Sequence, residues 1–373
     1  NLSFGDYFKR DAIRFAWELL TEVWRIRPDR LYATVFSGEG GVPRDDEAYD
    51  VWRKYLPADR VGELGLSDNF WAMGETGPCG RCSEIHYFHG NEIPCPEPVC
   101  TGVACSCDRF VEIWNNVFME FDRQADGQLN PLPARCIDTG MGLERVAAVL
   151  QGKLSNYDTD LFTPLIQALH RMTGARHEGG MSPADISTRV VADHMRATTF
   201  LIADGVTPSN EWRGYVLRKI MRRAMRHGKR LGLQEPALYQ LVDVLVKQMG
   251  DAYPELTSGR DHIVQVVRSE EERFETVLSS GLPRLEEVLD RAAATSSRVV
   301  PGEEAFRLYD TYGVPLDFIE DLAGERRLTL DGAGFDQAME AQRHKARSKS
   351  AFEGTRAESF SAAQEATAEA LRG

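Results

Sequence analysis

The stretch from Asp138 to Arg145 holds the residue types best suited to chemistry in this sequence. A carboxylate leaves the end of a predicted strand, glycines let a ligand approach the backbone, and an arginine follows one turn into a predicted helix. A carboxylate can bind an ammonium group, and a guanidinium can hold a phosphate through two hydrogen bonds. The helix N-terminus also favours an anion. The pattern predicts such a ligand site, although a strand–turn–helix junction with a capping aspartate would look similar.

A second concentration of charge lies between Arg213 and Arg230, where eight residues are Lys or Arg and none is acidic. At helical spacing the apolar residues form one inward stripe: Leu217, Ile220, Met221 and Ala224. Five basic residues gather on the outward side: Arg218, Lys219, Arg222, Arg223 and Arg226. Many charged helix faces are merely solvated. Because like charges without partners repel one another, we favour a polyanion as the occupant of this face.

Six of the seven cysteines crowd between Cys79 and Cys107. In a reducing compartment such crowding points to a metal or to free thiols rather than to disulfides. The ligands suffice for a tetrahedral zinc ion that would staple an excursion over 79–108. We take four residues as the candidate ligands: Cys79, Cys82, Cys105 and Cys107. Free thiols are the alternative, because the cysteine spacing is irregular.

The segments that must position these residues read as strands first and helices afterwards. Apolar and β-branched runs predict strands over 31–36, 84–88, 110–121 and 136–138. Helical periodicity predicts helices over 7–24, 143–150, 213–230 and 303–309, and a short helix that Asp45 or Asp46 caps. Beyond about Tyr157 the pattern is almost wholly helical. This order predicts an α+β protein: an antiparallel sheet domain followed by a helical domain.

The bulk composition sets limits on the protein class. Apolar residues make up 42% and charged residues 27% of the chain, as in ordinary globular proteins. A net charge of −13 excludes indiscriminate nucleic-acid binding, so any basic surface must be local. No signal peptide or long apolar run is visible, and we expect a cytoplasmic protein without membrane contact. The start at Asn1 suggests a piece of a longer chain.

The stretch Asp138–Arg145 resembles the third signature motif of class II aminoacyl-tRNA synthetases, in the form found in alanyl-tRNA synthetases. Four other blocks resemble the same family in the same order: residues 1–9, like the tail of its second motif, residues 67–80, like its pocket loop, and residues 112–115 and 213–218. The resemblance extends to about residue 345. Five blocks in one order are a specific signal.

The resemblance implies a class II catalytic core over 1–157, a helical tRNA-recognition domain over 158–345 and a polar tether over 346–373. It implies that ATP, with Mg²⁺, activates L-alanine to alanyl-adenylate and that alanine then passes to tRNA(Ala). The first motif, most of the second and the family's zinc-dependent editing domain are not among these residues. We therefore expect a truncated alanine–tRNA ligase that by itself need not be active.

The resemblance also assigns roles in the proposed pocket. It implies that Asp138 binds the substrate ammonium and that Arg145 holds ATP phosphate, with Glu112 near Mg²⁺ or ATP. A pocket for the methyl side chain would be lined by Trp71, Asn115, Val117 and the backbone near Gly140. Without the resemblance, Trp71 would read most simply as a core residue.

On the tRNA side, the resemblance points the basic helix at the acceptor stem. Asn210 and Asp310 match the positions that read the G·U wobble pair in this family. The helix contributes Arg213, Arg218, Arg222, Arg223 and Arg226. One departure is Trp212, which is bulky where the family commonly has a small or polar residue.

Two other functions fit parts of this pattern. A noncatalytic paralogue could bind tRNA or an amino acid, but a protein that only binds has no need of both Asp138 and Arg145. An inert folding module would leave the basic helix and the pocket motifs without a purpose.

Overall fold

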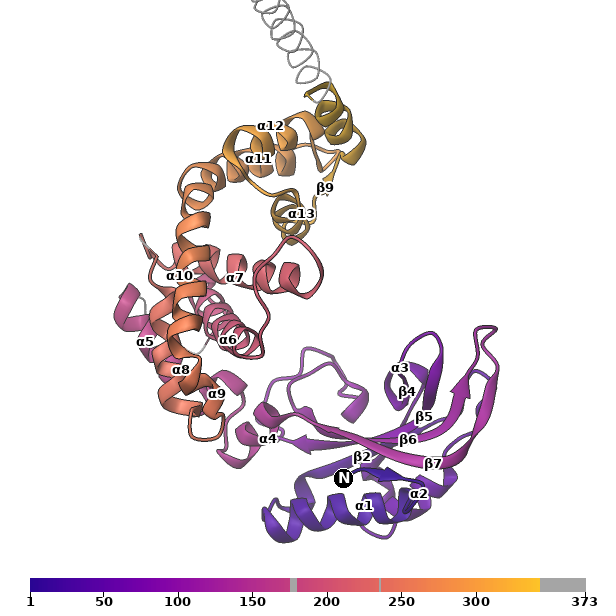
Figure 1. The fold of residues 1–373 in the computed structure, drawn as a ribbon. Helices are drawn as coiled ribbons and strands as arrows, with labels where there is room; N and C mark the ends of the chain where they lie inside the picture. The colour runs from indigo at the N-terminus through magenta and orange to yellow at the C-terminus, as the bar shows by residue number, and fades with distance from the viewer. Residues whose placement is uncertain (175–179, 235, 343–373) are drawn as a thin grey trace, which may run out of the picture. The chain divides into compact units, whose positions relative to one another are not determined.

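The computed structural model describes residues 1–174, 180–234 and 236–342, and the predicted tether over 346–373 lies outside these residues. The chain divides into two compact units, and the boundary along the sequence falls between Thr163 and Pro164. Strands dominate the first unit and helices the second (Figure 1). The predicted α+β class is therefore confirmed.

One sheet of seven strands organises the first unit, in the order β1-β7-β6-β5-β2-β3, with β4 paired to β5 beside β2. All its pairs are antiparallel except β2 with β3. The strands are β1 (Ser3–Phe4), β2 (Leu31–Phe36), β3 (Val61–Leu64), β4 (Phe70–Ala72), β5 (Gly77–Phe88), β6 (Phe110–Arg123) and β7 (Leu129–Met141).

Strand β7 is much longer than the three residues predicted for it, 136–138. It runs through Pro131 and Pro133, residues that normally interrupt a sheet. The partner strand β6 pairs with it as far as Leu129, whereas β1 reaches only Cys136 and Ile137. The proline segment is thus at an edge of the sheet, where a missing N–H costs little.

Helices α1 (Lys9–Glu18) and α2 (Asp46–Trp52) cover one face of the sheet (Figure 1). Their apolar sides, with Ile13 and Trp52 fully buried, join strand residues such as Phe118 in one core. Asp45 caps α2, as predicted, by accepting a hydrogen bond from Ala48 N at 3.2 Å. The predicted helix after β7 is also present as α4 (Leu143–Leu150).

The remaining segments of the first unit are short. Beside the four-residue α3 (Leu66–Asn69) they are single turns: η1 (Leu19–Val23), η2 (Pro28–Arg30), η3 (Ala58–Arg60), η4 (Gly102–Ala104) and η5 (Asn156–Asp158).

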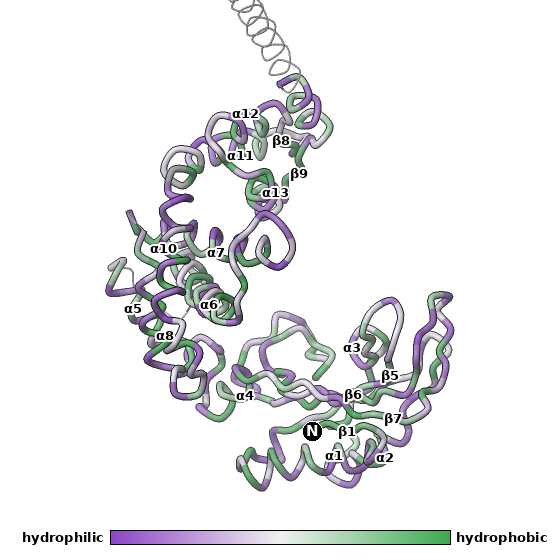
Figure 2. The backbone as a smooth tube through the Cα atoms, in the orientation of Figure 1, coloured by the Kyte–Doolittle hydropathy of each residue, from purple (hydrophilic) through white to green (hydrophobic). Residues whose placement is uncertain are grey.

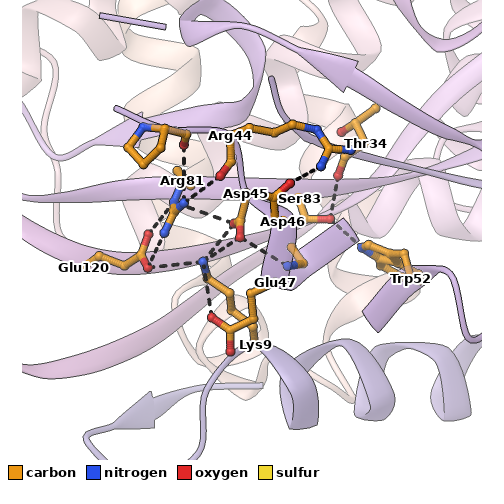
Figure 3. A network of polar contacts seen from close by, with 12 residues as sticks. Lys9, Thr34, Arg44, Asp45, Asp46, Glu47, Trp52, Arg81, Ser83 and Glu120 are labelled. Atoms are coloured by element: carbon orange, nitrogen blue, oxygen red, sulfur yellow. Dashed lines mark hydrogen bonds and ion pairs between the residues drawn. The ribbon is translucent and has the colours of Figure 1, made fainter. Parts of the chain in front are cut away.

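A buried network of charges lies between α1, α2 and the sheet (Figure 3). The Lys9 ammonium, which is fully buried, contacts Asp45 at 2.8 Å and Glu120 at 3.2 Å. Arg81 holds Glu120 through two hydrogen bonds of 2.7 and 2.8 Å. Burial alone would raise the pKa of Glu120, but Arg81 and Lys9 hold this pKa below its usual value. Each buried charge is therefore compensated by the others.

The second unit is built from α5 (Thr163–Thr173), α6 (Pro183–Ala203), α7 (Trp212–Arg230), η6 (Leu238–Gln240), α8 (Leu241–Met249), α9 (Pro254–Ser258), α10 (Arg260–Thr276), η7 (Val277–Gly281), α11 (Leu282–Ala294), α12 (Gly302–Tyr312) and α13 (Leu316–Glu325), and residues 332–342 are also helical. A single pair of short parallel strands, β8 (Val299–Val300) and β9 (Thr329–Leu330), interrupts the helices described here. Gly313 ends α12 in the left-handed conformation, which glycine adopts without strain.

The apolar and polar segments follow this architecture. Figure 2 shows a hydrophilic tip on the hairpin between β6 and β7 and mixed colouring along the helices, as expected of elements with one buried side. Among the described residues, no helix is both long and apolar enough to cross a membrane.

We predict that Lys9→Met destabilises the first unit by about 3–5 kcal/mol, because Asp45 and Glu120 would keep buried charge that a single Arg81 must balance. Urea unfolding measures this loss. Adding Asp45→Asn, which removes one negative charge and keeps the helix cap, should recover part of it.

Arg14→Met is the matched control, because Arg14 makes two ion pairs, at 3.1 and 3.0 Å, on the exposed side of the same helix. It should change the unfolding midpoint little. Equal effects of Lys9→Met and Arg14→Met would mean that the network does not hold the helices on the sheet.

Candidate functional site

The open face of the sheet gathers the predicted pocket residues. In the pairing of β6 with β7, Val117 lies opposite Asp138 and Asn115 opposite Gly140. The neighbouring pair Phe118 and Ile137 belongs to the core beneath α1. Because successive side chains of a strand alternate between faces, Asn115, Val117 and Asp138 lie on the face away from α1. The structure thus brings four predicted residues together across two strands.

Trp71 lies on β4, which pairs with the edge of β5 away from β6. It lies opposite Gly80 in the pairing of β4 with β5, and two residues further along β5 Cys82 lies opposite Val117. Trp71 is half-buried and is absent from the buried core, so the simpler interpretation as a core residue is not supported. A glycine is needed at position 80, because a Cβ there would come within 1.9 Å of the Phe118 carbonyl oxygen.

The polar atoms of this face are mostly acceptors. Within the described structure the buried Oδ1 of Asn115 has no hydrogen-bond partner. The Asp138 carboxylate accepts one bond, from Thr139 N at 2.8 Å, and is half-buried. A carboxylate with spare acceptor capacity near an unsatisfied amide oxygen suits a donor such as an ammonium group.

Arg145 lies in the first turn of α4, the helix that follows β7. Its Nη1 donates to Glu112 Oε2 at 2.8 Å and to the Glu112 carbonyl oxygen at 2.9 Å. The Arg145 side chain is 45% exposed and that of Glu112 is 33% exposed. Both described contacts use Nη1, so the opposite edge of the guanidinium can hold a phosphate. Gly142, and not Asp138, caps α4, which removes the alternative of a purely capping aspartate.

The cysteines separate into two groups, which corrects the predicted zinc ligands. Cys79 and Cys82 are buried in β5, and burial raises the pKa of Cys82 to about 12, with the Glu84 charge adding to the shift. Neither of them belongs to a group of possible metal ligands among the described residues. Cys105 and Cys107 instead gather with two cysteines that the prediction omitted, Cys95 and Cys100.

The sequence suggested that the basic side chains of α7 are without acidic partners, and for most of them this prediction is wrong. Five of its eight basic side chains form ion pairs with acidic residues of other helices: Arg218 and Arg222 with Glu270, Lys219 with Asp321, Arg226 with Glu325, and Lys229 with Glu275. Charge repulsion within the helix is therefore largely relieved inside the protein, and it does not by itself require a polyanion.

The arginines of α7 differ in accessibility. Arg226 is 1% exposed and is held by Glu325, so it stabilises the helix packing and presents no surface to a ligand. Its buried neighbour His227 has a pKa lowered to about 3, by burial and then by the Arg226 charge. Arg213 and Arg223 are exposed, and so is Trp212, at 88%.

The two residues matched to wobble-pair recognition share one cavity. Asn210 and Asp310 line a space of about 510 Å³ together with Arg218 and Arg222. Arg218 donates through Nη1 to Asn210 Oδ1 and through Nη2 to the Pro208 carbonyl oxygen at 3.2 Å. The cavity therefore offers amide, carboxylate and guanidinium groups from α7, α12 and the segment before α7.

Comparison with known proteins gives a consistent result. The chain matches the family described as tRNA synthetases class II (A) over residues 1–372. It is 52% identical over 364 residues to an alanine–tRNA ligase of Anaeromyxobacter sp. (strain Fw109-5), covering 92% of this chain and 40% of that protein. The corresponding protein of Stenotrophomonas maltophilia (strain K279a) is 52% identical over 369 residues, 95% of this chain and 39% of its own length. The chain thus spans about 40% of the length of these relatives.

Proposed function

We propose that this chain, which belongs to the tRNA synthetases of class II (A), is the part of an alanine–tRNA ligase that activates alanine and receives the acceptor end of tRNA(Ala). The observation that carries the proposal is the register of β6 with β7. It puts Asn115 and Val117 beside Gly140 and Asp138 on the open face of the sheet. Arg145 follows within one turn of α4.

The amino-acid end of the pocket follows from this geometry. Asp138 neutralises the α-ammonium group of L-alanine. The same ammonium group donates a further hydrogen bond to the unsatisfied Asn115 Oδ1. Val117, Trp71 and the bare backbone at Gly140 surround the methyl group. A small apolar pocket separates side chains by about 1–3 kcal/mol per methylene, so glycine and serine should be activated at some rate.

The phosphate end uses Arg145 and Glu112. We propose that Arg145 holds a phosphate of ATP and that Glu112 offers an oxygen ligand for the Mg²⁺ that accompanies ATP. An oxygen of the alanine carboxylate attacks the α-phosphorus, the bond to pyrophosphate breaks, and alanyl-adenylate remains. The protein contributes positioning and charge neutralisation, and forms no covalent bond in this step.

In the second step a hydroxyl of the terminal ribose attacks the alanyl carbonyl carbon, and AMP leaves. We propose that Asn210 and Asp310 read the acceptor stem in their shared cavity, and that the exposed Arg213 and Arg223 contact phosphates. The helical second unit is then the tRNA-recognition part. These substrates meet in the cytoplasm, where we place the protein.

We predict that the full-length protein catalyses alanine-dependent exchange between ATP and pyrophosphate, and that Asp138→Asn lowers kcat/KM for alanine by about 10²–10³-fold. The reason is that a charge-assisted bond to the substrate ammonium is worth about 3–4 kcal/mol in a partly buried site. Asp122→Asn, on the same sheet but near the hairpin tip, is the matched control.

Absence of alanine-dependent exchange in the unaltered full-length protein would support the noncatalytic paralogue instead. An equal loss in Asp138→Asn and Asp122→Asn would remove Asp138 from the pocket.

For the tRNA interface, we predict that Arg213→Ala and Arg223→Ala each weaken tRNA(Ala) binding and lower the salt slope by about one unit, because each removes a phosphate contact. Both should leave the melting temperature unchanged. Filter binding at several salt concentrations measures the affinity.

Arg226→Ala provides the contrast, because Arg226 is buried against Glu325. It should lower the melting temperature. An unchanged affinity and salt slope in the double variant Arg213→Ala/Arg223→Ala would show that the exposed arginines of α7 are not part of the tRNA interface.

A further inference from the structure

The loop between β5 and β6, residues 89–109, has little of what usually holds a folded segment. Between residues 91 and 109 the sole buried side chain is Cys107, and the one regular element is the turn η4. Three prolines fall between Ile93 and Val99. Long loops without a core of their own usually need a crosslink to adopt one conformation.

Four cysteines of this loop meet at one point. The Sγ atoms of Cys95, Cys100, Cys105 and Cys107 all lie within 4.8 Å of one another. Cys95 and Cys105 are separated by 3.6 Å, and Cys100 and Cys107 by 3.7 Å. A tetrahedral zinc ion with Zn–S bonds of about 2.3 Å separates its sulfur ligands by about 3.8 Å, whereas bonded sulfurs lie about 2.05 Å apart. The spacing is that of metal ligands.

We infer that Cys95, Cys100, Cys105 and Cys107 bind one structural Zn²⁺. Four thiolates close the coordination shell, which leaves no position for water or substrate, so the ion has a structural role and no catalytic one. A group this tight surrounds a single ion and not a cluster of several irons, which needs room between its ligands. The inference does not depend on the activity proposed above.

The zinc-bound loop would fix two contacts with the rest of the first unit. Val103 of η4 lies against Gly62 of β3, so closely that a Cβ at position 62 would approach Val103 Cγ2 to 2.7 Å. At the base of the loop, Arg30 Nη1 donates to the His89 carbonyl oxygen at 2.9 Å.

Arg109 ties the two halves of the loop together. Its Nε donates to the Ile93 carbonyl oxygen at 2.6 Å and its Nη2 to that of Asn91 at 3.3 Å. These bonds place the segment that carries Cys95 beside the segment that carries Cys107. The ligands from both halves are thereby brought together by the chain itself, and the ion locks an arrangement that the backbone contacts already favour.

The test is elemental analysis of the 373-residue chain, purified in reducing buffer without chelator. We expect one zinc per chain, lost in Cys100→Ser and in Cys105→Ser. The matched controls are Cys79→Ser, which belongs to the ligand set predicted from sequence, and Cys136→Ser in β7. Both should keep their zinc. Replacing zinc by Co²⁺ should give the intense visible absorption of a tetrahedral cobalt thiolate.

A second measurement uses the unaltered protein, in case a serine variant does not fold. An organomercurial that modifies thiols should release the zinc, and cleavage by a glutamate-specific protease at the exposed Glu92, which is followed by Ile93, should rise at least tenfold once the metal is removed. Absence of stoichiometric metal, iron in place of zinc, zinc retained by Cys100→Ser, or cleavage unchanged by metal removal would each overturn the inference.

Discussion

The compensation of buried charge beneath the sheet is the constraint on which the first unit depends. Lys9 is fully buried at the start of α1, and it can be so because Asp45 and Glu120 surround its ammonium group. Glu120 in turn is neutralised by Arg81 on the next strand. The network joins both helices to β5 and β6. Strand β6 carries Asn115 and Val117 on its other face, so the charges below the sheet fix the register of the site above it.

The exposure of the side chain separates arginines that stabilise the structure from those that are candidates for ligand binding. The Arg226 side chain is 2% exposed and its charge is used inside the protein, whereas that of Arg145 is 45% exposed and is held on one edge by Glu112. A guanidinium that is accessible but already oriented loses little freedom when a phosphate arrives. This is why we assign substrate contact to Arg145 and helix packing to Arg226.

Sequence reasoning succeeded where the pattern is local. The helix that ends at Leu150, the cap at Asp45 and the strand from Phe110 all follow from residues within one turn or one strand. The grouping of Asn115 and Val117 with Asp138 was accessible only through the family resemblance. Sequence reasoning alone does not show which strands pair. It failed where the partner is distant: Arg226 pairs with Glu325, and Arg218 with Glu270, across separations that a helical pattern does not reveal. The predicted cysteine set differs from the group that the structure brings together, because cysteine spacing does not show which thiols β5 buries.

The central claim is that the open face of the sheet binds alanyl-adenylate. Calorimetric titration of the full-length protein with a non-hydrolysable sulfamoyl analogue of alanyl-adenylate tests this claim most directly, with the leucyl analogue as the comparison. The account predicts saturable binding of the alanyl analogue, at least about tenfold weaker binding of the leucyl analogue because its side chain overfills the pocket, and loss of this preference in Val117→Ala. Equal binding of both analogues, or no binding of either, would contradict it.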